Sequence, residues 1–183
     1  MKSLNNSQHY ADTLYTLADQ VLELCKQNGA QQADVSLSQD TGFSANVRLG
    51  EVETVERTND QGVAVTVYVN QQKGTASTAD LRPESLIETV AQACAIARFT
   101  EADAASGLAD AHLMATEVMD FELWHPNPIT AEQGIALALE TEQAGLNQKN
   151  ISNSDGASYS SGLSTAIYAN SHGFKGAERS THF

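Results

Sequence analysis

The feature that most constrains the fold is the segment GVAVTVYVN at residues 62–70. Its valines alternate with Ala64, Thr66 and Tyr68, so one face would be aliphatic and the other largely apolar. A period of two built from β-branched residues is typical of a strand, and two apolar faces favour a central position in a sheet. We therefore expect a fold organised around this strand.

Shorter alternating segments lie on both sides of it. Gly50-Glu51 and Asp60-Gln61-Gly62 predict turns between them, and Val52 and Val55, on opposite faces, predict a bulge or an edge position. The small residues of GTASTAD let another layer approach closely or merely fill an edge. The predicted strands are 33–39, 42–49, 51–59, 62–70 and 74–79.

Three segments have the apolar spacing of helices. The first covers about 8–28, the second begins at Pro83 and covers 83–99, and the third follows a Thr130/Gln133 capping box and runs to about 146. Together these elements predict an α+β fold, with a mixed, largely antiparallel β-sheet and the first two helices packed on one face.

The chain is divided here into an α+β N-terminal domain, 1–128, and a second part, 129–183. The second part would hold the third helix and polar β-strands, as the start of a second layer or domain. Its last predicted strand stops at Phe183 without a cap or a closing turn. We interpret this as a chain cut inside a sheet.

The formal net charge of -13 predicts repulsion from phosphate backbones and anionic lipid, so neither nucleic acid nor a membrane is an expected partner. The first residues have no apolar signal-peptide core, and no run approaches the length of a membrane span. Cys25 and Cys94 lie in helical patterns, as expected of buried free thiols in a reducing compartment. These features favour a cytoplasmic protein.

The sequence contains no motif for zinc binding, phosphate binding or a serine nucleophile. Glu51, Glu53 and Glu56 form a carboxylate cluster, which we interpret as the solvated side of an edge strand rather than an acid–base site. Trp124 is interpreted as a side chain that fastens a loop to the core, with a partner anchor as the alternative.

Two polar segments, 62–81 and 151–174, combine hydroxyl and amide side chains with strong strand-pairing potential. Strand edges of this kind can bind an extended peptide by backbone hydrogen bonds, or they can simply pair with each other or with a missing part of the protein. The candidate peptide- or partner-binding residues are Thr75, Ser77, Thr78, Asn153, Ser154, Asn170, Ser171 and His172.

The stretches VRLGEVETVER, GVAVTVYVNQQKGTASTADL, GLAD and NSDGASYSSGLSTAIYANSHGF resemble the PmbA (TldE) branch of the TldD/PmbA family. The resemblance covers nearly the whole chain and corresponds to the amino-terminal part of such a subunit. It implies a cytoplasmic protein that acts with a TldD-type subunit on unfolded or extended peptides, maturing a peptide-antibiotic precursor and degrading an antitoxin. Family members also carry an older label as modulators of DNA gyrase.

In this family zinc is expected in the C-terminal half of the TldD-type partner, on an H-E-x-x-x-H type motif, so the resemblance implies no cofactor in this fragment. We therefore expect a non-catalytic domain that contacts a TldD-type subunit and an extended peptide substrate. The family is one of metallopeptidases, but no catalytic residue can be carried onto a position of this chain. The alternatives are a regulator or adaptor that binds a folded protein such as DNA gyrase, and a self-sufficient hydrolase.

Overall fold

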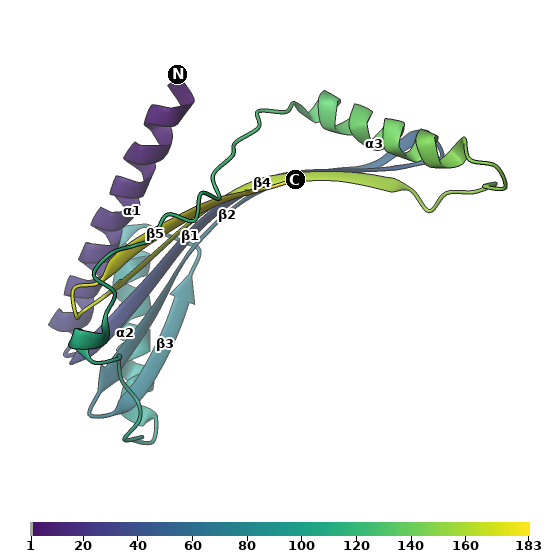
Figure 1. Cartoon of the computed structure of the whole chain (residues 1–183). Helices are drawn as coiled ribbons and strands as arrows, with labels where there is room; N and C mark the ends of the chain where they lie inside the picture. Colours follow the sequence, from purple (N-terminus) through teal and green to yellow (C-terminus); the bar gives the residue numbers. More distant parts are fainter. Residues whose placement is uncertain (1) are drawn as a thin grey trace. The chain divides into compact units, whose positions relative to one another are not determined.

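The computed structural model describes residues 2–183, with side chains from residue 12 onward. Five strands form one antiparallel sheet in the order β3-β2-β1-β4-β5, accompanied by three α-helices (Figure 1). This confirms the predicted α+β class. The elements are α1 (Lys2–Gln27), β1 (Gln32–Arg48), β2 (Glu51–Val69), β3 (Gln72–Thr78), α2 (Pro83–Phe99), the 3-10 helix η1 (Ala111–Leu113), α3 (Ala131–Leu146), β4 (Ala157–Asn170) and β5 (Lys175–His182).

Two pairs of predicted strands are single long strands. The segments 33–39 and 42–49 join in β1, and 51–59 and 62–70 join in β2. The turn expected at Asp60-Gln61-Gly62 is wrong, because this stretch keeps an extended conformation inside β2. The turn predicted at Gly50-Glu51 is confirmed one residue earlier: it lies between β1 and β2, where Leu49 and Gly50 both have positive φ (51° and 81°).

By its internal contacts the chain forms two compact units, each of which is described by itself. Unit 1 holds the chain up to Gln39 together with Gln61–Phe121 and Thr165–Glu178, and unit 2 holds Asp40–Asp60, Glu122–Ser164 and Arg179–Phe183. Strands β4 and β5 extend the sheet beyond β1 rather than lying apart from it. The domain division at residue 128 stays a prediction.

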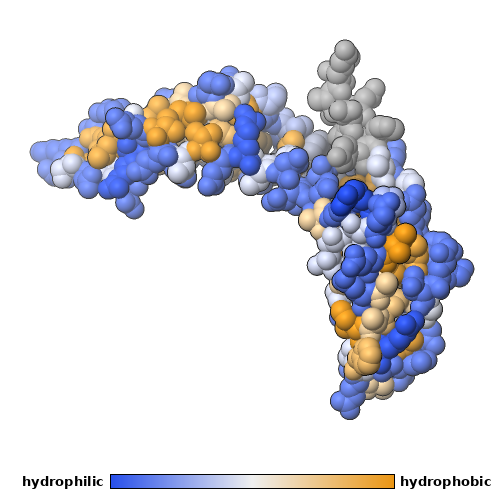
Figure 2. Space-filling view, turned by 180° about the vertical axis from the view of Figure 1, so that it is seen from behind, coloured by the Kyte–Doolittle hydropathy of each residue, from blue (hydrophilic) through white to orange (hydrophobic). Residues whose placement is uncertain are grey.

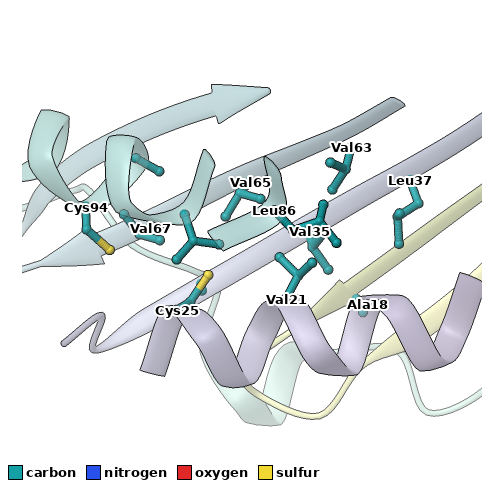
Figure 3. Close-up of a cluster of buried hydrophobic side chains, with 14 of the residues drawn as sticks. Ala18, Val21, Cys25, Val35, Leu37, Val63, Val65, Val67, Leu86 and Cys94 are labelled. Carbon is teal, nitrogen blue, oxygen red and sulfur yellow. The ribbon is translucent and has the colours of Figure 1, made fainter. Parts of the chain in front are cut away.

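The core of unit 1 lies between one face of the sheet and the helices α1 and α2, which confirms that both helices pack on the same face. Every buried strand residue in it has an odd number, as the alternation of a strand requires. Figure 3 shows side chains from α1, α2, β1 and β2 meeting there. The largest fully buried members are Val21, Cys25, Val35, Leu37, Val63, Val65, Val67, Val90, Cys94 and Ile167.

Helix α2 packs directly on β3 because both surfaces carry small residues. Gly74 of β3 lies opposite Val67 of β2 and faces Ala93 and Ala97 of α2. A methyl group on Gly74 would overlap the carbonyl oxygen of Ala93 and come within 2.5 Å of the backbone nitrogen of Ala97. The small residues of this strand therefore serve a close helix contact, the first of the two roles that the sequence left open.

In unit 2, α3 begins with the predicted capping box. The Gln133 amide N–H donates to Thr130 Oγ1 (3.3 Å), and the Thr130 N–H donates to Gln133 Oε1 (2.8 Å). Gly134 lies against the rings of Phe43 and Tyr159, where an added methyl group would be within 2.7 Å and 2.9 Å of ring carbons. These contacts fix the first turns of α3 to β1 and β4.

Candidate functional site

The face of the unit 1 sheet opposite its two helices carries a chain of hydrogen-bonding side chains. Thr75 of β3 lies across from Thr66 of β2, and its hydroxyl donates to Thr66 Oγ1 at 3.4 Å. The Thr66 side chain in turn hydrogen-bonds the carboxylate of Asp34 on β1. Because alternate strand residues share a face, these groups and Tyr68 line the same side of the sheet. We call this set the polar face.

Burial is the largest cause of the pKa shifts of Asp34 and Tyr68 on the polar face. The pKa of Asp34 is raised because the carboxyl is half-buried, and the Thr66 hydrogen bond and the charge of Lys73 oppose that shift. The pKa of Tyr68 is raised by burial and by the negative charge of Asp34. A carboxyl, hydroxyls and a phenol side by side offer donors and acceptors to a polar ligand, as an extended peptide backbone would require.

The predicted binding residues of β3 take two different positions. Thr75 and Ser77 are exposed, and their register opposite Thr66 and Ala64 assigns them to the polar face. Thr78 belongs to the opposite side, and its hydroxyl accepts a hydrogen bond from the Asp80 N–H at 3.1 Å. Thr75 and Ser77 are thus accessible to a ligand, whereas the Thr78 hydroxyl already stabilises the turn after β3.

Asn170, Ser171 and His172 form the turn between β4 and β5 and are largely engaged within the protein. Asn170 is 3% exposed, and its Oδ1 accepts from the N–H groups of His172 (3.0 Å) and Phe174 (3.2 Å). Ser171 makes two hydrogen bonds with Ala33. The Ser171 N–H donates to the Ala33 carbonyl (2.8 Å), and the Ala33 N–H donates to Ser171 Oγ (3.0 Å). These residues hold the turn against the start of β1.

The imidazole of His172 also fastens the connector between α2 and α3. Its Nδ1 lies 3.0 Å from the carbonyl oxygen of Ala109, and its Nε2 lies 3.4 Å from Gln32 Nε2. Gln32 Oε1 accepts from the Leu108 N–H at 2.9 Å. Because the carbonyl can only accept and the amide NH₂ can only donate, the Nδ1–H of His172 donates to Ala109 and its Nε2 accepts from Gln32. The GLAD stretch is therefore held to the edge of the polar face.

The remaining predicted residues, Asn153 and Ser154, lie in unit 2, before β4. Asn153 is exposed. The Ser154 carbonyl accepts from Arg48 Nε at 3.4 Å, and its Oγ accepts from the Gly156 N–H at 2.9 Å. Its side chain also hydrogen-bonds Glu142 of α3. Ser154 therefore has a structural role in this unit.

Glu142 is a residue that the sequence reasoning missed. Its two carboxylate oxygens accept from the Leu49 N–H (2.8 Å) and the Gly50 N–H (2.9 Å), the two turn residues with positive φ. The Gly50 and Ser154 hydrogen bonds are the largest causes that lower the pKa of this carboxyl. An acidic residue in the middle of an amphipathic helix carries no sign of such a partner, so only the fold reveals it.

Groups able to perform covalent chemistry are poorly placed. Burial raises the pKa of Cys25 to about 12 and also raises that of Cys94, so both thiols stay protonated and unreactive at neutral pH. Among the described residues no cluster of three or more His, Cys, Asp or Glu could hold a metal ion. Within the same part of the chain, no helix has the length and apolar character to cross a membrane.

Unit 1 also has an open groove of about 490 Å³ beside α1. The described residues that line it are leucines with threonine and glutamine side chains around them, and none of these is titratable. The groove can hold an apolar or amide-bearing group but offers nothing for acid–base catalysis. Its lining residues are Thr13, Leu14, Thr16, Leu17, Gln20, Gln39, Gln61 and Leu81.

The connector after α2 exposes several large apolar side chains. Leu113, Val118, Met119 and Phe121 are between 52% and 71% exposed. Figure 2 shows apolar residues on the surface of the molecule among the hydrophilic ones. Trp124, just beyond, packs under Arg179, whose guanidinium carbon lies 5.0 Å from the ring centroid, and the Thr181 N–H donates to the Leu123 carbonyl. The tryptophan thus contacts β5, the edge strand of the sheet, and does not belong to the hydrophobic core described for unit 1.

Comparison with known proteins identifies the family. The description "PmbA/TldA metallopeptidase domain 1" matches residues 33–97, and "PmbA/TldA metallopeptidase central domain" matches residues 124–183. The Metalloprotease PmbA homolog of Haemophilus influenzae is 43% identical over 153 residues, which cover 83% of this chain and 34% of that protein. The chain belongs to the PmbA/TldD family, in its PmbA branch.

Other relatives of the PmbA branch agree. Metalloprotease PmbA of Escherichia coli O157:H7 is 38% identical over 94% of this chain and 38% of its own length. The chain spans between about a third and two fifths of the curated PmbA proteins it matches. This family member therefore corresponds to the first and central domains of PmbA/TldD metallopeptidases.

Solved structures confirm the fold. A Bacteroides thetaiotaomicron protein described as a candidate modulator of DNA gyrase has a TM-score of 0.79 at 24% identity, over 93% of this chain and 39% of its own. TldE from Thermococcus kodakarensis has a TM-score of 0.67 at 12% identity, over 90% of this chain and 37% of its own. At these identities the likeness concerns the fold.

Proposed function

We propose that this PmbA-family chain is a non-catalytic part of a peptidase complex, which contacts an extended peptide and a TldD-type subunit. The observation that carries the proposal is the polar face, where Thr75, Thr66 and Asp34 form a hydrogen-bonded row within domain 1 of the family. Hydroxyl and carboxyl groups beside an edge strand can hydrogen-bond the backbone of a peptide that binds in an extended conformation.

The surroundings of the polar face support a role in binding rather than in bond cleavage. Burial raises the pKa of both thiols, and the Asp34 carboxylate accepts a hydrogen bond from the Thr66 hydroxyl. Zinc would be supplied by the TldD-type partner, as the family resemblance implies. The proposal includes a cytoplasmic location, and the acidic surface disfavours nucleic acid and anionic membranes.

The exposed apolar side chains of the connector support the subunit contact. Leu113, Met119 and Phe121 are each more than 60% exposed, which is unusual for a surface that faces only water. Apolar and aromatic side chains are enriched in the centre of protein–protein interfaces. These exposed side chains of the connector would contact the TldD-type subunit.

The test uses the full-length PmbA-type protein with its TldD-type partner and an unfolded peptide. Replacing Thr75 and Ser77 with arginine would obstruct the polar face, and we expect KM for the peptide to rise about tenfold with kcat nearly unchanged. Thr41→Arg with Thr141→Arg, two exposed threonines in unit 2, is the matched control. Unchanged KM in the first variant would rule out peptide binding at this face.

A second candidate function has one observation in its favour. Two of the similar solved structures, from Bacteroides thetaiotaomicron and Thermotoga maritima, are described as candidate modulators of DNA gyrase. An acidic chain could bind a basic DNA-binding surface by charge. Binding to gyrase measured at low ionic strength tests this function, and no binding there, where attraction between charges is strongest, would exclude it.

A further inference from the structure

The first half of β2 has a neighbouring strand on one side only. On the inner side, β1 accompanies it, with Asn46 Nδ2 donating to Thr54 Oγ1 at 2.7 Å. On the outer side, β3 is shorter than β2, and their register ends at the pair Val63–Thr78. Among the described residues, no strand therefore covers the outer edge of Glu51–Asp60.

This stretch, which we call the β2 free edge, lies wholly within unit 2, and each of its residues is exposed. Alternate residues of a strand direct their N–H and C=O groups to one edge, so about half of these backbone groups have only water as a partner. A strand of this length extends about 33 Å. The β2 free edge is thus long enough to pair with a whole strand of another chain.

Unpaired edges are usually protected by charged side chains, proline or bulges, and the β2 free edge has no proline but has charged residues at half of its positions. These charges oppose pairing with a strand of like charge. The β2 free edge also retains good strand formers, with Val52 and Val55 exposed at 45% and 47%. Valine favours the extended conformation that pairing with another strand requires. Both valines would be covered if another strand paired beside them.

The charge of the β2 free edge selects the partner. It carries four acidic residues on its two faces and one base. The base, Arg57, lies over the Phe43 ring at 5.6 Å from the centroid and is turned toward β1. Among the described residues, none of the four acids makes an ion pair. The acids are Glu51, Glu53, Glu56 and Asp60.

We propose that the β2 free edge binds an extended polypeptide segment with lysine or arginine on both of its faces, which adds a strand to the sheet beside β2. Opposite charges across neighbouring strands are favourable, and like charges are unfavourable. A second copy of this chain is therefore disfavoured, because antiparallel pairing of the edge with itself would bring acidic residues face to face. The proposal holds whether or not the polar face binds a substrate.

The test uses this chain and a fluorescent peptide of about ten residues, with lysine on both faces and valine or threonine between. Binding is followed by fluorescence anisotropy, and the site by hydrogen exchange of backbone amides. We expect the peptide to bind and to protect amides within 51–60. A peptide of the same sequence, N-methylated along both edges, keeps its charge but loses its backbone donors and should bind at least about tenfold more weakly.

The second part of the test reverses the charge of the β2 free edge. The triple variant Glu51→Lys, Glu53→Lys and Glu56→Lys should weaken binding of the basic peptide about tenfold and create binding of a peptide with glutamate in place of lysine. The matched control changes three exposed acids elsewhere, with the same change in net charge, and should retain most of the binding. Its substitutions are Glu84→Lys, Glu117→Lys and Glu140→Lys.

Several results would overturn the proposal. Equal binding of the N-methylated peptide would show charge attraction without strand pairing, and equal effects of the two triple variants would show that the β2 free edge is not the site. Hydrogen-exchange protection confined to amides outside 51–60 would also show that the β2 free edge is not the site. Self-association of the chain through these residues, seen by sedimentation without peptide, would show that a second copy is the occupant.

Discussion

Gly74→Ala is the substitution that most sharply tests the packing of α2 on the sheet. A methyl group at this position would overlap the Ala93 carbonyl oxygen and lie 2.5 Å from the Ala97 nitrogen and 3.0 Å from the Ala97 Cα. All three atoms belong to the helix backbone, so no side-chain rotation can make room. Either α2 must move away from β3 or the strand must bend.

The expected cost follows from this geometry. Forcing a methyl group into a packed interior destabilises a protein by about 1–3 kcal/mol, and a rigid backbone contact belongs in the upper part of that range. Replacing a strand glycine with alanine also stabilises the protein by about 0.5–1 kcal/mol, because the unfolded chain then has less conformational entropy to lose on folding. The net loss is about 2 kcal/mol, which for a chain of this size lowers Tm by about 4–8 °C.

Thermal and urea unfolding followed by circular dichroism measure this loss. Gly145→Ala is the matched control, because the same methyl group would meet nothing within 4 Å on α3, and it should leave Tm unchanged or raise it slightly. A Gly74→Ala protein that melts within 1 °C of the wild type would refute the close contact between α2 and β3.

Three further predictions concern buried and titrating groups. Val65→Asp should yield insoluble protein, since it places an unpaired charge in the core at a cost above about 4 kcal/mol, and normal melting would show that β2 is not central. Glu142→Gln should destabilise at pH 7, because the Leu49 and Gly50 N–H groups favour the carboxylate. Its folded pKa is lowered, so the difference from wild type in urea unfolding should shrink as pH falls below 4.5. Asp34→Asn should have the opposite pH dependence. The pKa of Asp34 is raised in the folded protein, so the wild type loses stability as pH rises past the ordinary value of 3.8. The variant should therefore be more stable than the wild type at pH 7 but not at pH 3.

Much of the fold follows from local patterns in the sequence. The alternation of Val63, Val65 and Val67 predicts the stretch of β2 that has a strand on each side, and Pro83 and the Thr130 capping box predict where α2 and α3 begin. The lengths of β1 and β2 do not follow, because the predicted strands break after residue 39 and at the Asp60-Gln61-Gly62 turn. Neighbouring strands keep Gly62 extended, and no local sequence pattern shows that these neighbours are there.

The candidate site could be predicted only in part. Thr75 and Ser77 are on an accessible face, as their alternation implies, and stay predicted binding residues. Asn170 is equally polar, but its amide is enclosed by its own turn, which sequence spacing cannot show. Glu142 shows the converse: its partners are turn N–H groups more than ninety residues away in the chain, so their proximity depends on the tertiary fold.

The central claim is that this chain takes part in proteolysis without a catalytic centre of its own. The most direct test measures zinc content and cleavage of an unfolded peptide, for this chain alone and mixed with a TldD-type subunit. We predict no bound zinc and no cleavage by the chain alone, with cleavage appearing or changing on mixing. Stoichiometric zinc together with cleavage by the isolated chain would contradict the claim.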